Sequence, residues 1–325
     1  MRGCLASRLQ NLSYSNLTRA SIYSISDSDR EGINLVYERL GPTPRLCLDY
    51  FKDLDHRRQY ESDVGLEISN LTCKSLEKLF SDASTLEMDK LSHKICLVSR
   101  DILENVASLP IVEPITPYVR SKLVCQLRIL ERREQVRLYK RFAKKSESRA
   151  LAGVAFEAAG QAMLQDGMGL VLVPMVHHPP KPCTPRPPWY SSHVLQRNVE
   201  LEQLRQIALG NTLSLTVPSG IFEYTDNGPL SIKPDIFYLP EMTNKIAFDA
   251  FILLNGILYL FQFTIGDQHD VKPGLKDFLA TCAGIPAMDH WRFVFIIPPN
   301  HTLIAPQPRF LDIRAIPFYS TVITL

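Results

Sequence analysis

The apolar stretch at residues 246–265, IAFDAFILLNGILYLFQFTI, constrains the fold of this chain more than any other segment. Its length is close to the roughly 20 residues that a membrane-spanning helix needs. However, Asp249, the pair Asn255-Gly256 and Gln262 interrupt it. Asn-Gly between two β-rich runs is the strongest short signal for a hairpin with a two-residue turn. The stretch therefore predicts a buried β-hairpin and not a membrane span.

The two-residue turn also fixes which residues of the hairpin face each other. If Asn255-Gly256 forms the turn, counting outward along both strands places Asp249 opposite Gln262. Directly opposed residues have Cβ atoms ~4.5–5.5 Å apart and project to the same face. Thr264 faces the same side, because side chains in a strand alternate with a period of two. A carboxylate and an amide oxygen are thus expected to meet on one face.

A buried acid in an apolar hairpin needs a partner, because burial of an unpaired charge is costly. One interpretation is that Asp249 and Gln262 satisfy each other, or nearby backbone groups, inside a core. The other is a hard-cation site, since Mg²⁺ prefers carboxylate, amide and water oxygens. Glu157, on a helix expected at 151–165, would complete such a ligand set with a strand carbonyl. On this second interpretation Mg²⁺ is the expected cofactor.

Composition restricts the class of protein to which the chain can belong. With 325 residues, of which 45% are hydrophobic and 22% charged, it can bury a core of one large domain or about two. Its seven cysteines include no Cys-x-x-Cys pair, which argues against a disulfide framework and a zinc knuckle. No secretory signal follows the N-terminus. We therefore expect a reducing, intracellular setting without a membrane segment.

The order of the expected elements favours an α/β or α+β fold with a mixed sheet. Residues 1–110 are expected to form a mainly helical region, and residues 111–325 a second domain that contains a proline-rich loop at 179–188. Besides the hairpin, the strands expected are 170–176, 213–217, 222–225, 234–240 and 292–298, and the helices 121–150, 151–165, 201–209 and 273–283.

Residues 121–150 carry ten Lys and Arg residues against three Glu, although the net charge of the whole chain is only +2. Leucines recur there at helical spacing, so one amphipathic helix with a basic face is expected. That face is either simply solvated or a track for a phosphate backbone, whose contribution to affinity would depend on salt. The candidate nucleic-acid contacts are Arg132, Arg133, Arg137, Lys140, Arg141 and Lys144.

The order of an acid on a helix, an acid on a strand and an amide two residues before a polar group on the next strand resembles the restriction-endonuclease-like fold. More closely, residues 110–325 resemble the C-terminal nuclease-like module of Crinkler and retrotransposon-hot-spot type proteins. The resemblance implies a mixed sheet flanked by helices and a metal-dependent nuclease. It is carried by Gly153–Glu157, Val173–Met175, Ala247–Asp249, Leu258–Thr264, His269, Lys272–Leu275 and Trp291–Phe295.

Members of that group commonly join the module to an upstream P-loop ATPase, and some act as effectors on host nuclei. No Gly-x-x-x-x-Gly-Lys-Ser/Thr sequence occurs in this chain, so residues 1–110 are at most an ATPase remnant and ATP hydrolysis is not expected. The resemblance implies an ATPase-containing relative or a host protein as partner, and a nuclear location.

Carried over to this sequence, the resemblance makes Glu157 the helix acid, Asp249 the central metal ligand and Gln262 the residue at the Asp/Glu position. Thr264 stands where lysine is expected, and a neutral hydroxyl cannot stabilise negative charge as lysine does. Three alternatives remain open. The cation is supplied from elsewhere in the chain, the protein is a slow nuclease, or the fold binds nucleic acid without cutting it.

His269 and Lys272, just past the second hairpin strand, are the favoured sources of a displaced cation or proton-handling group; Lys276 and Lys245 are further candidates. The preferred hypothesis is a Mg²⁺-dependent nuclease-like domain that acts on phosphodiesters, of DNA rather than RNA. The alternatives are a catalytically inactive module of the same fold that binds nucleic acid or protein, and an interaction scaffold shortened from a longer, ATPase-containing protein.

Overall fold

The computed structural model divides into two compact units, Met1–Glu61 and Ser62–Leu325. The sequence favoured a boundary after residue 110, and that assignment of domains stays a prediction. The residues described are 26–78, 90–99, 102–103, 106–107, 111–176, 189–190, 206–218, 220–224, 229–240, 248–269, 271, 275–299, 301, 303–305 and 316–325. The proline-rich segment 179–188 therefore lies outside the described residues.

The described residues of the first unit are mainly helical. It contains α2 (Asp27–Leu40), α3 (Pro44–Tyr50) and the start of α4 (Leu54–Ser69). The side chain of Ser26 accepts a hydrogen bond from the Asp29 N–H and so caps α2. A small core forms where α2 meets α3, around Val36 and Cys47. This part of the predicted mainly helical region is confirmed.

The start of the second unit departs from that prediction. After α6 (Lys90–Ile95), strand β1 (Cys96–Ser99) pairs antiparallel with β4 (Ile111–Pro114), and β2 (Ile102–Leu103) pairs with β3 (Val106–Ala107). No strand was predicted here, because these strands are too short for a clear alternation of apolar and polar residues. The helical prediction for residues 1–110 was thus wrong in this segment.

The basic segment folds as two helices and not as one. It forms α7 (Pro117–Arg128) and α8 (Arg132–Ala143), followed by η1 (Ser146–Ser148) and α9 (Arg149–Gln165). The buried side chain of Gln135 donates hydrogen bonds to the carbonyls of Leu127 and Arg128, which closes the end of α7. The spacing of the leucines does not show this break, because both helices pack against α9 and therefore both carry apolar residues at helical spacing.

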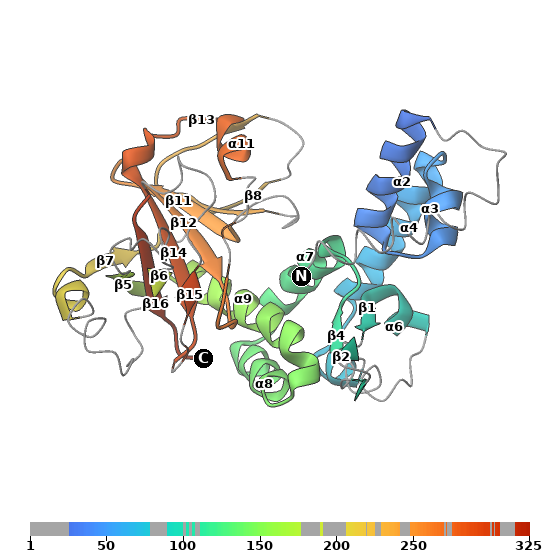
Figure 1. Cartoon of the computed structure of the whole chain (residues 1–325), viewed down its shortest axis with the longest axis horizontal. Coiled ribbons are helices and arrows are strands. Elements are labelled where there is room, and N and C mark those ends of the chain that lie inside the picture. Colours follow the sequence, from blue (N-terminus) through green and yellow to red (C-terminus); the bar gives the residue numbers. More distant parts are fainter. Residues whose placement is uncertain are drawn as a thin grey trace. The chain divides into compact units, whose positions relative to one another are not determined.

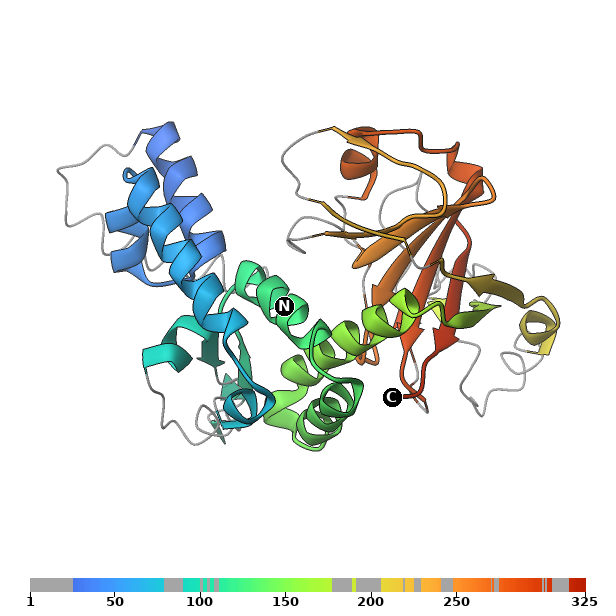
Figure 2. The ribbon, with the colours of Figure 1, turned by 180° about the vertical axis from the view of Figure 1, so that it is seen from behind.

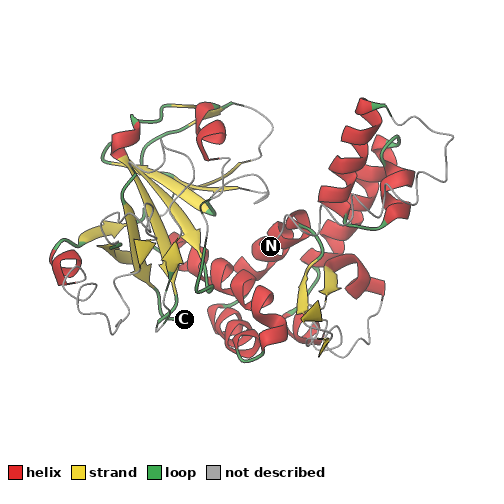
Figure 3. Cartoon of the chain, viewed as in Figure 1, coloured by secondary structure: helices red, strands yellow, loops and turns green. Residues whose placement is uncertain are grey.

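An eight-stranded mixed sheet dominates the rest of the second unit, and Figure 3 shows its strands in yellow, lying side by side. Its order is β7-β5-β16-β14-β12-β11-β10-β8. The pairs β16–β14, β14–β12 and β10–β8 are parallel and the others antiparallel. The strands are β5 (Gly169–Pro174), β7 (Leu213–Thr216), β8 (Ile221–Tyr224), β10 (Phe237–Pro240), β11 (Ala250–Leu254), β12 (Ile257–Phe263), β14 (Trp291–Ile297) and β16 (Phe318–Val322).

Short elements flank this sheet. They are β6 (Trp189–Tyr190) with β15 (Ile304–Ala305), β9 (Leu230–Ser231) with β13 (Cys282–Ala283), α11 (Leu275–Ala280) and η2 (Met288–His290). The expected α+β class with a mixed sheet is confirmed. Among the described residues, no helix combines the length and the apolar character that a membrane crossing requires.

The predicted hairpin is confirmed as β11–β12, with Leu254 paired to Ile257. Asn255 and Gly256 have φ values of 51° and 75°, the positive values that a type I′ turn requires. The stretch that resembled a membrane span therefore lies in the sheet, where β12 is paired on both sides.

Both faces of the central strands β11, β12 and β14 are covered. One face carries the large apolar core, in which Leu258 and Leu260 of β12 pack with Leu275 of α11. On the other face Phe156 of α9 meets the ring of Phe263 edge to face at 6.4 Å. Figures 1 and 2 show α9, in light green, running beside the strands. The sheet and α9 thus enclose the ends of the two hairpin strands.

Candidate functional site

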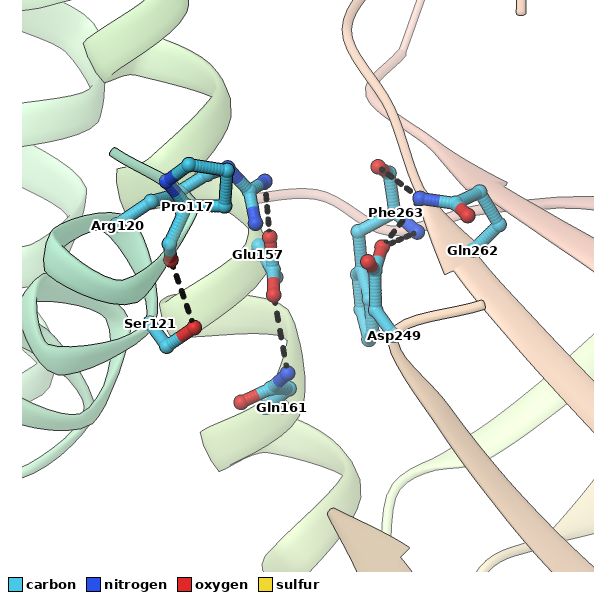
Figure 4. Close-up of polar contacts among 8 residues, drawn as sticks. All are labelled: Pro117, Arg120, Ser121, Glu157, Gln161, Asp249, Gln262 and Phe263. Carbon is cyan, nitrogen blue, oxygen red and sulfur yellow. Dashed lines mark hydrogen bonds and ion pairs between the residues drawn. The ribbon is translucent and has the colours of Figure 1, made fainter. Parts of the chain in front are cut away.

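Asp249 and Gln262 meet at the open end of the hairpin, as the register predicts. Gln262 Nε2 donates a hydrogen bond to Asp249 Oδ2 at 2.6 Å, and the Phe263 N–H donates to the same oxygen at 2.8 Å. Both polar residues are only 6% exposed. Figure 4 shows both donors directed at the carboxylate of Asp249 from the same side. The predicted meeting of a carboxylate and an amide is confirmed, although the amide presents its nitrogen to Asp249.

Glu157 lies on α9 and is 0% exposed. Arg120 donates to its Oε2, and Gln161 Nε2 donates to its Oε1 at 3.4 Å. The helix approaches the hairpin closely because Gly160 has no side chain: a Cβ there would lie 2.4 Å from the ring of Phe263. The sequence of α9 therefore places a carboxylate inside the protein beside the end of β12.

Arg120 is the member of this site that the sequence did not indicate. It lies in the first turn of α7, which begins at Pro117 and is capped by Thr116, whose hydroxyl accepts from the Val119 N–H. Burial opposes its charge, but the negative charges of Glu157 and Asp249 outweigh that effect, so the pKa of Arg120 is raised. One guanidinium thus interacts electrostatically with both buried acids. In Figure 4 Glu157 lies next to Arg120, and Asp249 lies across from them beside Gln262.

The only signal for Arg120 in the sequence is indirect. A carboxylate buried on an alanine-rich helix requires a counter-charge, but nothing in the sequence shows which of the 36 basic residues supplies it.

We refer to six side chains as the buried polar cluster. Counted formally, its two carboxylates and one guanidinium give one net negative charge. Carboxylate and amide oxygens are the donor types that Mg²⁺ takes, so Asp249 and Gln262 fit a hard cation in their chemistry, with the Gln262 amide turned to present its oxygen. Glu157 fits only if Arg120 leaves it. The cluster consists of Arg120, Glu157, Gln161, Asp249, Gln262 and Thr264.

Within the described ranges, no group of three or more His, Cys, Asp or Glu side chains is arranged to hold a metal ion. A site at Asp249 would therefore depend on amide, backbone or water oxygens in addition to the Asp249 carboxylate.

Thr264 and His269 take local structural roles in this structure. The Thr264 hydroxyl accepts a hydrogen bond from the Gly266 N–H at 3.1 Å and the residue is 6% exposed. The ring of His269 packs edge to face on Phe295 at 6.0 Å, and its backbone N–H donates to Ile304. Lys272 and Lys245 lie outside the described residues, as does the side chain of Lys276. Neither contact joins Thr264 or His269 to the acids.

The six basic residues that were predicted to contact nucleic acid all lie at exposed positions of α8 or directly after it. Arg137 and Arg141 each donate to the carboxylate of Glu77 at 2.9 Å. The remaining four, which have no ion pair within the described part of the chain, are Arg132, Arg133, Lys140 and Lys144. The amphipathic character predicted for this segment is thus confirmed, while contact with nucleic acid stays a prediction.

Comparisons of the chain with protein-family models, with curated proteins and with solved structures find no match. Its function therefore has to follow from the chemistry of its own residues.

Proposed function

We propose that this chain is a nuclease-like module with a restriction-endonuclease-like sheet, which engages nucleic-acid phosphodiesters at the buried polar cluster. The observation that supports the proposal is the Asp249–Gln262 pair at the end of a central hairpin, with a second buried acid, Glu157, beside it. Polar side chains at such positions are costly in a core unless they are paired or serve a ligand. The residual negative charge of the cluster favours a cation as that ligand.

In this proposal Asp249 and Gln262 hold Mg²⁺. When bound, the ion would lower the pKa of a water molecule and stabilise negative charge on a phosphodiester. Glu157 does not bind the ion in this proposal, because both of its carboxylate oxygens already accept hydrogen bonds. Its contact with Arg120 holds the guanidinium next to the site. The exposed basic residues of α8 supply contacts to the phosphate backbone, and such contacts weaken as salt rises.

The test is cleavage of a fluorescently labelled DNA duplex in Mg²⁺ by the full chain and by Asp249→Ala. We expect the variant to lose cleavage while its affinity for the duplex in EDTA stays unchanged. Asp267→Ala is the matched control, because this acid is 67% exposed and pairs with Arg149 at the surface. Full cleavage by Asp249→Ala would overturn the proposal.

A second candidate function is binding of nucleic acid without cleavage. The observation that favours it is that the polar groups of the site already have partners within the protein. The Thr264 hydroxyl accepts a hydrogen bond from the Gly266 N–H. Oδ2 of Asp249 and both carboxylate oxygens of Glu157 also accept hydrogen bonds. This candidate predicts salt-sensitive binding with no cleavage in Mg²⁺ or Mn²⁺. Replacement of Arg132, Arg133 and Lys140 by Glu would weaken that binding, because all three are exposed on α8.

A further inference from the structure

We propose that Arg120 is the side chain of the buried polar cluster that contacts the phosphodiester directly. This inference rests on the proposed function and deepens it by naming the residue that recognises the phosphate.

Exposure distinguishes Arg120 from the rest of the cluster. Glu157 is 0% exposed, Gln161 2%, and Asp249, Gln262 and Thr264 6% each. The side chain of Arg120 is 30% exposed. Of the six side chains, Arg120 is therefore the one with a substantial part of its surface open to solvent.

Charge points to the same residue. Arg120 is the one cation among the six side chains, and a phosphodiester is an anion. Its guanidinium has five N–H donors, arranged in a fork that matches two phosphate oxygens. Glu157 accepts from one of its terminal nitrogens and so fixes the direction of the side chain. The neutral hydroxyl of Thr264, engaged by the Gly266 N–H, cannot replace this charge.

The alternative is that Arg120 only compensates the charge of Glu157. The two roles predict different results when Arg120 is replaced and when the charge of Glu157 is removed. If Arg120 serves only the fold, its loss and the loss of the Glu157 charge disturb the same contact and affect binding alike. If Arg120 binds phosphate, removing the Glu157 charge leaves the guanidinium in place and takes a negative charge away from the phosphate. The two variants then move affinity in opposite directions.

The experiment measures binding of a labelled DNA duplex in EDTA by fluorescence anisotropy at several salt concentrations. We expect Arg120→Gln to weaken binding several-fold and to lower the slope of log affinity against log salt by about 0.9, the value for one lost phosphate contact. Arg120→Lys should retain most of the affinity, and Glu157→Gln should bind as tightly as the wild type or more tightly.

Arg128→Gln is the matched control. Arg128 lies on the same helix with its side chain 10% exposed, held by Gln161 and Glu223, so its loss should leave affinity unchanged.

Two results would overturn the inference: wild-type affinity and salt slope in Arg120→Gln, or equal weakening in Arg120→Gln and Glu157→Gln. If Arg120→Gln does not fold, the double variant Arg120→Gln/Glu157→Gln removes both charges and should bind less tightly than Glu157→Gln alone; equal affinity would also overturn it. Absence of duplex binding by the wild type at low salt would overturn the proposed function itself, and this inference with it.

Discussion

The two acids that are buried within the described part of the chain, Asp249 and Glu157, are stabilised in different ways. Asp249 accepts hydrogen bonds from a side-chain amide and a backbone N–H, which are neutral donors. Glu157 is paired with the guanidinium of Arg120 and also accepts from Gln161. A neutral donor lowers the cost of burying a carboxylate but leaves its charge, whereas a guanidinium cancels it. The comparison shows that Glu157 is the acid that holds Arg120, and in the proposed function Asp249 is the acid that would bind the cation.

The largest expected effect comes from removing the guanidinium that pairs with Glu157. Arg120→Met keeps the bulk of the side chain but leaves Glu157 buried without its counter-charge. Breaking a buried ion pair from one side costs about 3–5 kcal/mol, and we expect the lower end because the Arg120 side chain is 30% exposed. Both tryptophans, Trp189 and Trp291, lie in the unit Ser62–Leu325, so their fluorescence during urea unfolding reports its stability.

The double variant Arg120→Met/Glu157→Gln should recover much of that loss, since it buries no unpaired charge. A single-variant loss below about 1 kcal/mol, the range of surface pairs, would contradict the assignment of Glu157 and Arg120 as a buried pair.

A smaller effect is expected where a neutral donor is removed. Gln262→Leu takes the amide from Asp249 but leaves the Phe263 N–H, and an under-satisfied buried acceptor costs about 1–3 kcal/mol. Gln161→Leu is the matched variant on the other acid. Because Glu157 keeps the charged partner Arg120, this second substitution should destabilise the protein less. If unfolding of the two variants shows the opposite order, the distinction between the two acids is wrong.

The sequence predicted the hairpin well because few residues determine it. Asn255-Gly256 sets a turn with positive φ at both positions, and the turn sets the register that brings Asp249 to Gln262. Strand β14 was also predictable, since a continuous apolar run is typical of a strand buried on both faces. These features depend on local chemistry and on pairing between neighbours in the chain.

The rest depends on contacts between distant segments. The end of α7 is closed by the side chain of Gln135, seven and eight residues beyond the carbonyls that it binds, and leucine spacing does not show such a contact. Arg120 meets Glu157 across 37 positions of the chain. The close approach of α9 to the sheet depends on Gly160 facing Phe263. This contact can be recognised only when the packing of the two elements is known.

The most direct test of the central claim, that Asp249 lies at a hard-cation site, is binding of Mn²⁺ to the full chain, followed by electron paramagnetic resonance. The probe is the metal alone, so the result does not depend on cleavage. We predict that the wild type and Asp267→Ala bind Mn²⁺ with the same affinity and that Asp249→Ala loses this binding while its tryptophan fluorescence shows a folded chain. Equal Mn²⁺ binding by the wild type and Asp249→Ala, or none by the wild type, would contradict the claim.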